Sequence, residues 1–176
     1  MTVRVRVSSR DGDERGAVAV EFALVLPILV MLLLGTVTAG LSYSHAVGLS
    51  NAVREGSRFA ATTPYPPLSG DWATDVISRT RAVQFDDPSA LTQICVWLYK
   101  QGGGTLTSRC DAGTDAVPLP PLTEPATPAG IQVGDCVVKV AASRHYDINA
   151  VLVNFSNRVM TRQSVALYET SPCGTS

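Results

Sequence analysis

A carboxylate, Glu21, lies inside a long apolar stretch, and its position needs a chemical explanation. The stretch runs from Ala17 to Leu41, and Glu21 is its fifth residue. An ionised side chain at membrane depth is costly and is retained mainly where it pairs with an opposite charge or faces a protein interior. Glu21 is therefore a candidate for an ion pair with a neighbouring chain. The alternative is that it lies shallow enough to reach the cytoplasmic headgroups.

The cysteines Cys95, Cys110, Cys136 and Cys173 all follow the apolar stretch, and none forms a C-x-x-C pair typical of zinc or redox sites. An even number on one side of a membrane segment favours disulfides in an oxidising compartment, with four reduced core cysteines as the alternative. Three pairings are possible. We favour Cys95–Cys110, because a hairpin at Gly102–Gly104 could join them, with Cys136–Cys173 tying down the carboxyl tail.

His145 and Asp147 are the residues with which a catalytic group could be built. No nucleophile elbow, phosphate loop or metal-ligand motif accompanies them in the sequence. We interpret His145 as a surface or hydrogen-bonded residue and predict no catalytic residue, metal or cofactor. The net charge of -1, with no basic stretch among aromatics, argues against a nucleic-acid partner.

The apolar stretch itself predicts a membrane-spanning helix. Its roughly 37 Å length as a helix exceeds the about 30 Å of a hydrocarbon layer. Arginines at positions 4, 6, 10 and 15 precede it, so the positive-inside rule places the amino terminus in the cytoplasm and exports the rest.

The helical pattern continues beyond the span as far as Pro64, with small residues at every fourth position. Such a row lets two helix backbones approach closely. Chance in a Gly- and Ala-rich segment is the alternative, and the protein's own domain is one possible partner. The row comprises Gly40, Ser44, Gly48, Ala52, Gly56 and Ala60.

The remaining residues predict a small α+β domain, since prolines at 64, 66 and 67 end the long helix. We expect the fold to be a long N-terminal transmembrane helix extending into an antiparallel-sheet domain with one or two short helices. The expected elements are a helix at 71–84, a hairpin of 92–99 with 105–110, a proline-containing loop at 111–130, strands at 131–146 and 159–169, and an apolar segment at 148–155 that could be a short helix.

The residues Arg15, Gly16, Ala17, Glu21 and Phe22 resemble the processing signal of type IV pilins and pseudopilins. In those proteins a prepilin peptidase cuts after the glycine on the cytoplasmic face, and the glutamate aids assembly. The resemblance implies a cut between Gly16 and Ala17, after which Glu21 neutralises the new amino group of a neighbouring subunit. Such pairing would reward correct register, because each charge is costly alone in hydrocarbon.

The runs Arg15–Ala17, Glu21–Pro27 and Asn51–Ala60 resemble the TadE-like proteins, minor pseudopilins of the tight-adherence (Flp) pilus machinery. Phe22 stands where these signals often have tyrosine. A weaker likeness reaches the end of the domain, where Glu169 would close the last strand. The resemblance implies a leader at 1–16, a transmembrane and extended helix at 17–63 and an extracytoplasmic domain at 64–176.

By this resemblance the chain is a membrane-anchored minor pseudopilin that docks through its N-terminal helix. Its expected partners are the membrane, other pilin or pseudopilin subunits, the pilus assembly machinery and prepilin peptidase. It would be a single-pass protein of the cytoplasmic membrane, with the C-terminal domain outside the cytoplasm and possible display on a surface pilus.

Two other functions remain open. Val37-Thr38-Ala39 before Gly40 is acceptable for signal-sequence cleavage, which would leave a secreted or surface-bound binding module. An uncut chain would serve as an envelope scaffold. The residue at which the mature chain begins distinguishes the three.

Overall fold

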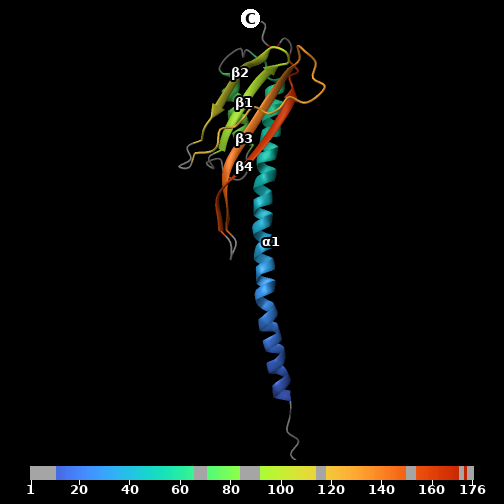
Figure 1. Cartoon of the computed structure of the whole chain (residues 1–176), viewed down its shortest axis with the longest axis vertical. Helices are drawn as coiled ribbons and strands as arrows, with labels where there is room; N and C mark the ends of the chain where they lie inside the picture. Colours follow the sequence, from blue (N-terminus) through green and yellow to red (C-terminus); the bar gives the residue numbers. More distant parts are fainter. Residues whose placement is uncertain are drawn as a thin grey trace, which may run out of the picture.

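The computed structural model describes residues 11–65, 71–83, 92–113, 118–149, 154–170 and 173, and it confirms the α+β class. A long helix carries a small domain at its carboxyl end (Figure 1). The elements are α1 (Asp11–Thr62), α2 (Trp72–Ala82), β1 (Thr92–Lys100), β2 (Gly104–Asp111), β3 (Cys136–Asn149) and β4 (Asn154–Leu167).

The strands of the described residues form one antiparallel sheet in the order β2-β1-β3-β4. The last part of α1 packs on β3 and β4, and α2 packs beside it on β1 and β2. Both helices therefore cover the same face of the sheet, which alternation within each strand makes apolar. The buried residues of this face are Ile94, Val96, Leu98, Val138 and Val140, and they meet Leu49, Val53, Trp72 and Val76 of the helices.

The opposite face of the sheet is covered in part by the loop after β2. Cys95, Trp97 and Ala141 pack there against Leu122 of that loop. Beside them the side chain of Lys139 is 3% exposed, and its Nζ lies 2.7 Å from Glu124 Oε1 of the loop and 4.2 Å from the ring centroid of Tyr99. A buried ammonium needs such partners, so this ion pair fixes the loop on the sheet.

The carboxyl end of α1 is closed by the chain that follows β4. Glu169 N–H donates to the Ala61 carbonyl at 3.0 Å. The Tyr168 hydroxyl accepts from Tyr65 N–H at 2.6 Å and lies 3.1 Å from the Thr63 carbonyl, to which it donates. Carbonyls at a helix end lack intrahelical partners, and these contacts supply them.

Two disulfides join the cysteines in the pairing that the sequence favours. Cys95 and Cys110 lie opposite each other in the β1–β2 register, with their Cα atoms 4.1 Å apart. Cys136 at the start of β3 is bonded to Cys173 in the carboxyl tail.

Three expected elements in the carboxyl half have the wrong bounds or type. The expected strand at 131–146 begins only at Cys136, because Gly130 and Gly134 have positive φ angles of 93° and 101° and form turns. The expected strand at 159–169 instead spans Asn154–Leu167. Ile148 and Phe155 are paired strand residues and not the ends of a short helix, whereas 150–153 lie outside the described residues. A short apolar run does not distinguish helix from strand, and the cross-strand pairing decides.

Gly56 allows α1 and α2 to pack closely. A Cβ atom at Gly56 would overlap Thr80 Oγ1, and it would lie 3.1 Å from Thr80 Cβ. Thr80 is buried and donates its hydroxyl to the Val76 carbonyl at 2.7 Å, so it has little freedom to move. The contact between the two helices therefore depends on the missing side chain.

We predict that Gly56→Ala destabilises the domain. Overpacking costs about 1–3 kcal/mol, and alanine regains at most about 1 kcal/mol of helix propensity. Urea unfolding of the full chain in detergent, followed by tryptophan fluorescence, measures the change. Gly40→Ala is the matched control, since nothing lies within 4 Å of a Cβ there. Thr80→Ala added to the Gly56→Ala variant should recover part of the lost free energy of unfolding. Equal stability of the Gly56→Ala and Gly40→Ala variants would contradict the close packing of α1 and α2 at Gly56.

Asp71 is the N-cap of α2. Its Oδ1 accepts from Ala73 N–H at 3.1 Å, its Oδ2 accepts from the Thr74 hydroxyl at 2.9 Å, and the Arg109 guanidinium also contacts Oδ2. The Thr74 hydrogen bond is the largest cause of a folded-state pKa below the ordinary 3.8, with Ala73 and Arg109 adding to it against some desolvation. A depressed carboxyl pKa contributes stability above the unfolded pKa, and this is lost as pH falls through the folded pKa.

We predict that Asp71→Asn, which keeps a capping oxygen but removes the charge, lowers the melting temperature at neutral pH. The difference from the unsubstituted protein should shrink as pH falls below about 4. Thermal scans of both proteins across that range provide the measurement. Thr74→Ala removes the largest cause of the pKa shift and should weaken the same pH dependence; a pH-independent difference would contradict the assignment.

Candidate anchoring and assembly site

The amino-terminal part of α1 is an exposed apolar rod. Within the described residues, one helix segment, Gly16–Thr62, is long and apolar enough to cross a membrane, with an 18-residue window of mean hydropathy 2.7 that is not buried. Val18, Leu24 and Leu33 are 65%, 70% and 64% exposed. Soluble monomers rarely show such continuous apolar surface, so this part of α1 is suited to an environment of lipid or other helices.

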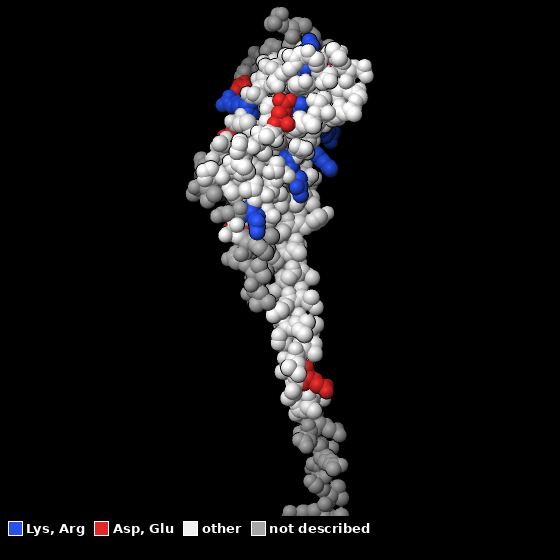
Figure 2. All heavy atoms as spheres, in the orientation of Figure 1, with Lys and Arg blue, Asp and Glu red and all other residues white. Residues whose placement is uncertain are grey.

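Glu21 lies on this rod, with its side chain exposed along the helix. In Figure 2 the slender part of the molecule is uncharged except for one acidic patch. Glu21 is the only acidic residue between Gly16 and Glu55 in the sequence. Phe22 beside it is 59% exposed. The carboxylate is thus presented to whatever surrounds the rod, which is the placement an intermolecular ion pair needs.

The expected processing site lies within α1. The helix begins at Asp11, and both Gly16 and Ala17 are exposed on it. Apart from its chain neighbours and the nearby backbone of its own helix, no atom of the described residues lies within 4 Å of a Cβ at Gly16. Ala17 and Glu21 are four residues apart, hence on the same helix face and about 6 Å apart along the axis.

The row of small residues divides into two parts. Ala52, Gly56 and Ala60 are buried against the domain. Gly40 and Ser44 are exposed, and Gly48 between the two groups is partly buried. The carboxyl part of the row therefore packs within this chain, whereas the part nearest the apolar rod remains available to another helix.

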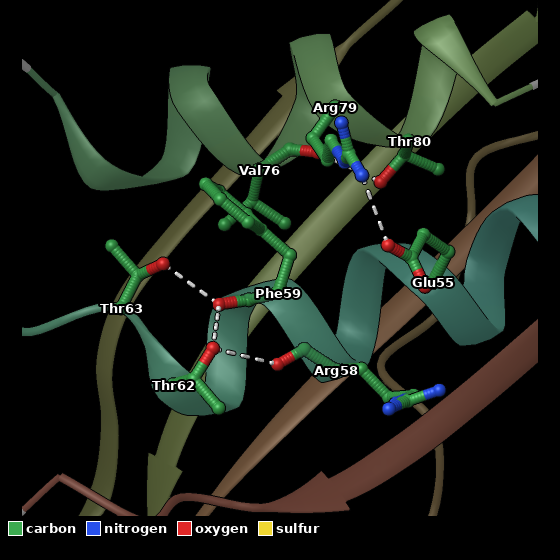
Figure 3. A network of polar contacts seen from close by, with 8 residues as sticks. All are labelled: Glu55, Arg58, Phe59, Thr62, Thr63, Val76, Arg79 and Thr80. Carbon is green, nitrogen blue, oxygen red and sulfur yellow. Dashed lines mark hydrogen bonds and ion pairs between the residues drawn. The ribbon is translucent and has the colours of Figure 1, made fainter.

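A groove of about 430 Å³ lies between the last turns of α1 and the end of β4. Its charged groups are Glu55, Arg58 and Glu169. Glu55 Oε1 lies 3.2 Å from Arg79 Nη2 of α2, as Figure 3 shows, and both side chains are exposed enough that the pair contributes below about 1 kcal/mol. The other lining residues are Phe59, Ala61, Thr62, Ala166 and Leu167.

The final turn of α1 forms part of the lining of this groove. Phe59 packs against the core cluster that includes Val76, and its carbonyl accepts from the Thr62 and Thr63 hydroxyls at 3.1 and 2.7 Å (Figure 3). The Thr62 hydroxyl is also within 3.3 Å of the Arg58 carbonyl. The motif Asn51–Ala60 gives no sign of this groove, because Ala166 and Leu167 reach it through the pairing of β4 with β3, and Glu169 through its backbone hydrogen bond to Ala61.

His145 lies on β3, opposite Val159, and is partly buried. Neither ring nitrogen has a hydrogen-bond partner among the described residues. In the same part of the chain no group of three His, Cys, Asp or Glu side chains is arranged to hold a metal ion.

Comparison with known families identifies the amino-terminal segment. Residues 16–58 match the family model described as TadE-like protein, which confirms the resemblance read from the sequence. The matched segment contains the apolar rod, Glu21 and the helix turns that enter the domain. Neither the comparison with curated proteins nor that with solved structures gives a match.

Proposed function

We propose that this TadE-like chain is a minor pseudopilin, a subunit that assembles with other pilin-like subunits of a tight-adherence pilus through α1. The observation that carries the proposal is the exposed apolar rod with Glu21 in the segment matched by the family. The TadE-like match fits a pilus-associated, membrane-anchored protein. The docking role is the step beyond the match.

The membrane anchor determines on which side of the membrane the domain lies. The arginines before Gly16 hold the amino terminus in the cytoplasm, so the domain lies outside the cytoplasm while α1 spans the membrane as a single pass. The two disulfides of the domain are consistent with an oxidising compartment on that side. Prepilin peptidase would reach the Gly16–Ala17 bond from the cytoplasmic face.

Glu21 determines the axial offset between the helices of neighbouring subunits. Cleavage after Gly16 creates an ammonium at Ala17, and Glu21 of a neighbouring subunit neutralises it. The carboxylate and the ammonium are both expensive in hydrocarbon, so they favour the one axial offset between helices that pairs them. Gly40 and Ser44 lie on the exposed part of the same helix and allow the neighbouring backbone to come close. Phe22 adds apolar contact beside the charge.

We predict that the mature chain begins at Ala17. Mass spectrometry of the membrane and pilus fractions, from a host carrying the chain's own secretion genes, measures the start directly. Gly16→Val should leave the leader attached, and Gly35→Val is its control, because a Cβ at either glycine meets no atom within 4 Å. A start at Gly40 would instead indicate a secreted module, and an unprocessed chain would indicate an envelope scaffold.

We predict that Glu21→Ala abolishes incorporation into the pilus while membrane insertion persists, since removal of the charge makes the span more apolar. Shearing the pili from cells and comparing the subunit in the sheared and membrane fractions tests this. Thr36→Ala is the control, because the Thr36 hydroxyl already donates to the Leu33 carbonyl at 2.8 Å within the helix. Normal incorporation of the Glu21→Ala protein would remove the carboxylate from the mechanism.

A further inference from the structure

The hairpin of β3 and β4 projects beyond the rest of the sheet. Among the described residues the pairing of β1 with β3 ends at Thr92 with Arg144, whereas the backbones of β3 and β4 stay paired as far as Asn149 with Asn154. We call this two-stranded part, 145–149 with 154–159, the hairpin arm. It points toward the amino-terminal half of α1 (Figure 1).

One side-chain contact gives the level along α1 that the hairpin arm reaches. Ser57 Oγ of α1 lies 2.8 Å from Ser164 Oγ of β4. The backbone of Asn154 is ten residues before Ser164, which corresponds to at most about 34 Å of strand. Along a helix that distance is roughly 23 residues, so the arm ends near residue 34 of α1 or somewhat after it. This level is inside the apolar stretch, which continues to Leu41.

The exposure of α1 changes at the same level. All residues of 16–33 are exposed, and Leu34 is the first partly buried one. Thr38, Ser42 and His45 are also partly buried, and spacings of three and four residues place them on the face of Leu34. The apolar stretch thus has a first part that is exposed on all faces and a second part, from Leu34 on, that is covered on one face.

The hairpin arm itself is unsuited to hydrocarbon. Among the described residues its two strands pair only with each other, so each strand has an outer edge of backbone N–H and C=O groups. Such open edges do not occur in the hydrocarbon region, because lipid offers them no hydrogen bonds. The arm also contains the ionisable residues His145, Asp147 and Arg158. An arm that reaches this level therefore requires the hydrocarbon layer to end near Leu34.

We propose that the hairpin arm limits how far α1 enters the membrane, so that the hydrocarbon layer ends near Leu34 and the helix beyond it stands outside the lipid. The inference rests on the proposed anchoring by α1. The lipid-embedded part is then 17–34, about 27 Å of helix, instead of the roughly 37 Å of the whole apolar stretch. The folded domain, and not the length of the apolar stretch, determines the depth of the anchor.

This depth decides between the two environments that the sequence allows for Glu21. Leu34 is thirteen residues after Glu21, or about 20 Å of helix, so roughly 10 Å of a hydrocarbon layer about 30 Å thick remain on the cytoplasmic side. A layer that reached Leu41 would instead place Glu21 about 30 Å from its outer surface, at the cytoplasmic headgroups. The hairpin arm thus keeps the carboxylate in hydrocarbon, where it needs the ammonium of a neighbouring chain.

The test measures lipid depth on the full chain in nanodiscs of phosphatidylethanolamine and phosphatidylglycerol, with one chain per disc. Four variants each carry one spin label at an exposed position: Val20→Cys beside Glu21, Leu29→Cys in the lipid-embedded part, Leu41→Cys at the end of the apolar stretch and Ala129→Cys in a loop of the domain. Collision with oxygen reports lipid, and collision with a nickel chelate reports water. We expect the oxygen-to-nickel ratio at Leu41→Cys to match that at Ala129→Cys, and the ratios at Val20→Cys and Leu29→Cys to be several-fold higher.

A thicker bilayer tests the role of the arm. In discs of lipids with longer acyl chains, a helix without a stop would sink until Leu41 is surrounded by lipid. With the hairpin arm as the stop, the label at Leu41→Cys stays as water-exposed as that at Ala129→Cys.

Three outcomes would contradict the inference. A lipid-exposed label at Leu41→Cys, in either bilayer, overturns the stop but leaves the anchor intact if the label at Leu29→Cys is in lipid too. A water-exposed label at Val20→Cys beside a lipid-exposed one at Leu29→Cys also overturns it, because Glu21 would then lie at the headgroups. A water-exposed label at Leu29→Cys overturns the anchor itself, and with it the proposed function.

Discussion

The structure depends on the burial of one face of α1 against the sheet over its last turns. Leu49, Val53 and Ala60 enter the core there, and Gly56 lets α2 close over the same turns. The helix segment 16–33 has no such cover and, apart from Glu21, is apolar and exposed. One continuous helix therefore contains both a part that is packed in the domain and an exposed apolar part, and the two follow each other without a break.

Because α1 is continuous, the orientation of the domain follows the orientation of the exposed part of the helix. A flexible linker would let the domain tumble independently, whereas an unbroken helix transmits its direction. Hydrogen bonds fix β4 beside the helix. They are made by the Tyr168 hydroxyl, by the Glu169 N–H and between Ser57 and Ser164. Any register imposed on α1 by neighbouring helices is thus also imposed on the sheet.

Sequence reasoning succeeded where the signal is local. The stop at Pro64, the start of α2 near residue 71 and the turn at Gly102–Gly104 are each encoded within a few residues, and the structure has them. It failed for 131–135, where positive φ angles at Gly130 and Gly134 form turns, and for the ends of the 148–155 segment, where the pairing of β3 with β4 decides. The groove between α1 and β4 was missed for the same reason. The roles of Gly16, Ala17, Glu21 and Phe22 in processing and assembly stay predictions, since they concern partners.

The parallel course of α1 and β4 has a mechanical consequence. Both elements run in the same direction toward the carboxyl end of the domain (Figure 1), because Ser57 lies beside Ser164 and Ala61 beside Glu169. A pull along α1 therefore loads the helix–sheet contacts in shear, so that many must yield together instead of one after another. The Cys136–Cys173 bond ties the chain beyond β4 back to β3, so part of the load passes into a central strand. A protein built this way would bear tension along its long axis better than force that peels the sheet from the helix.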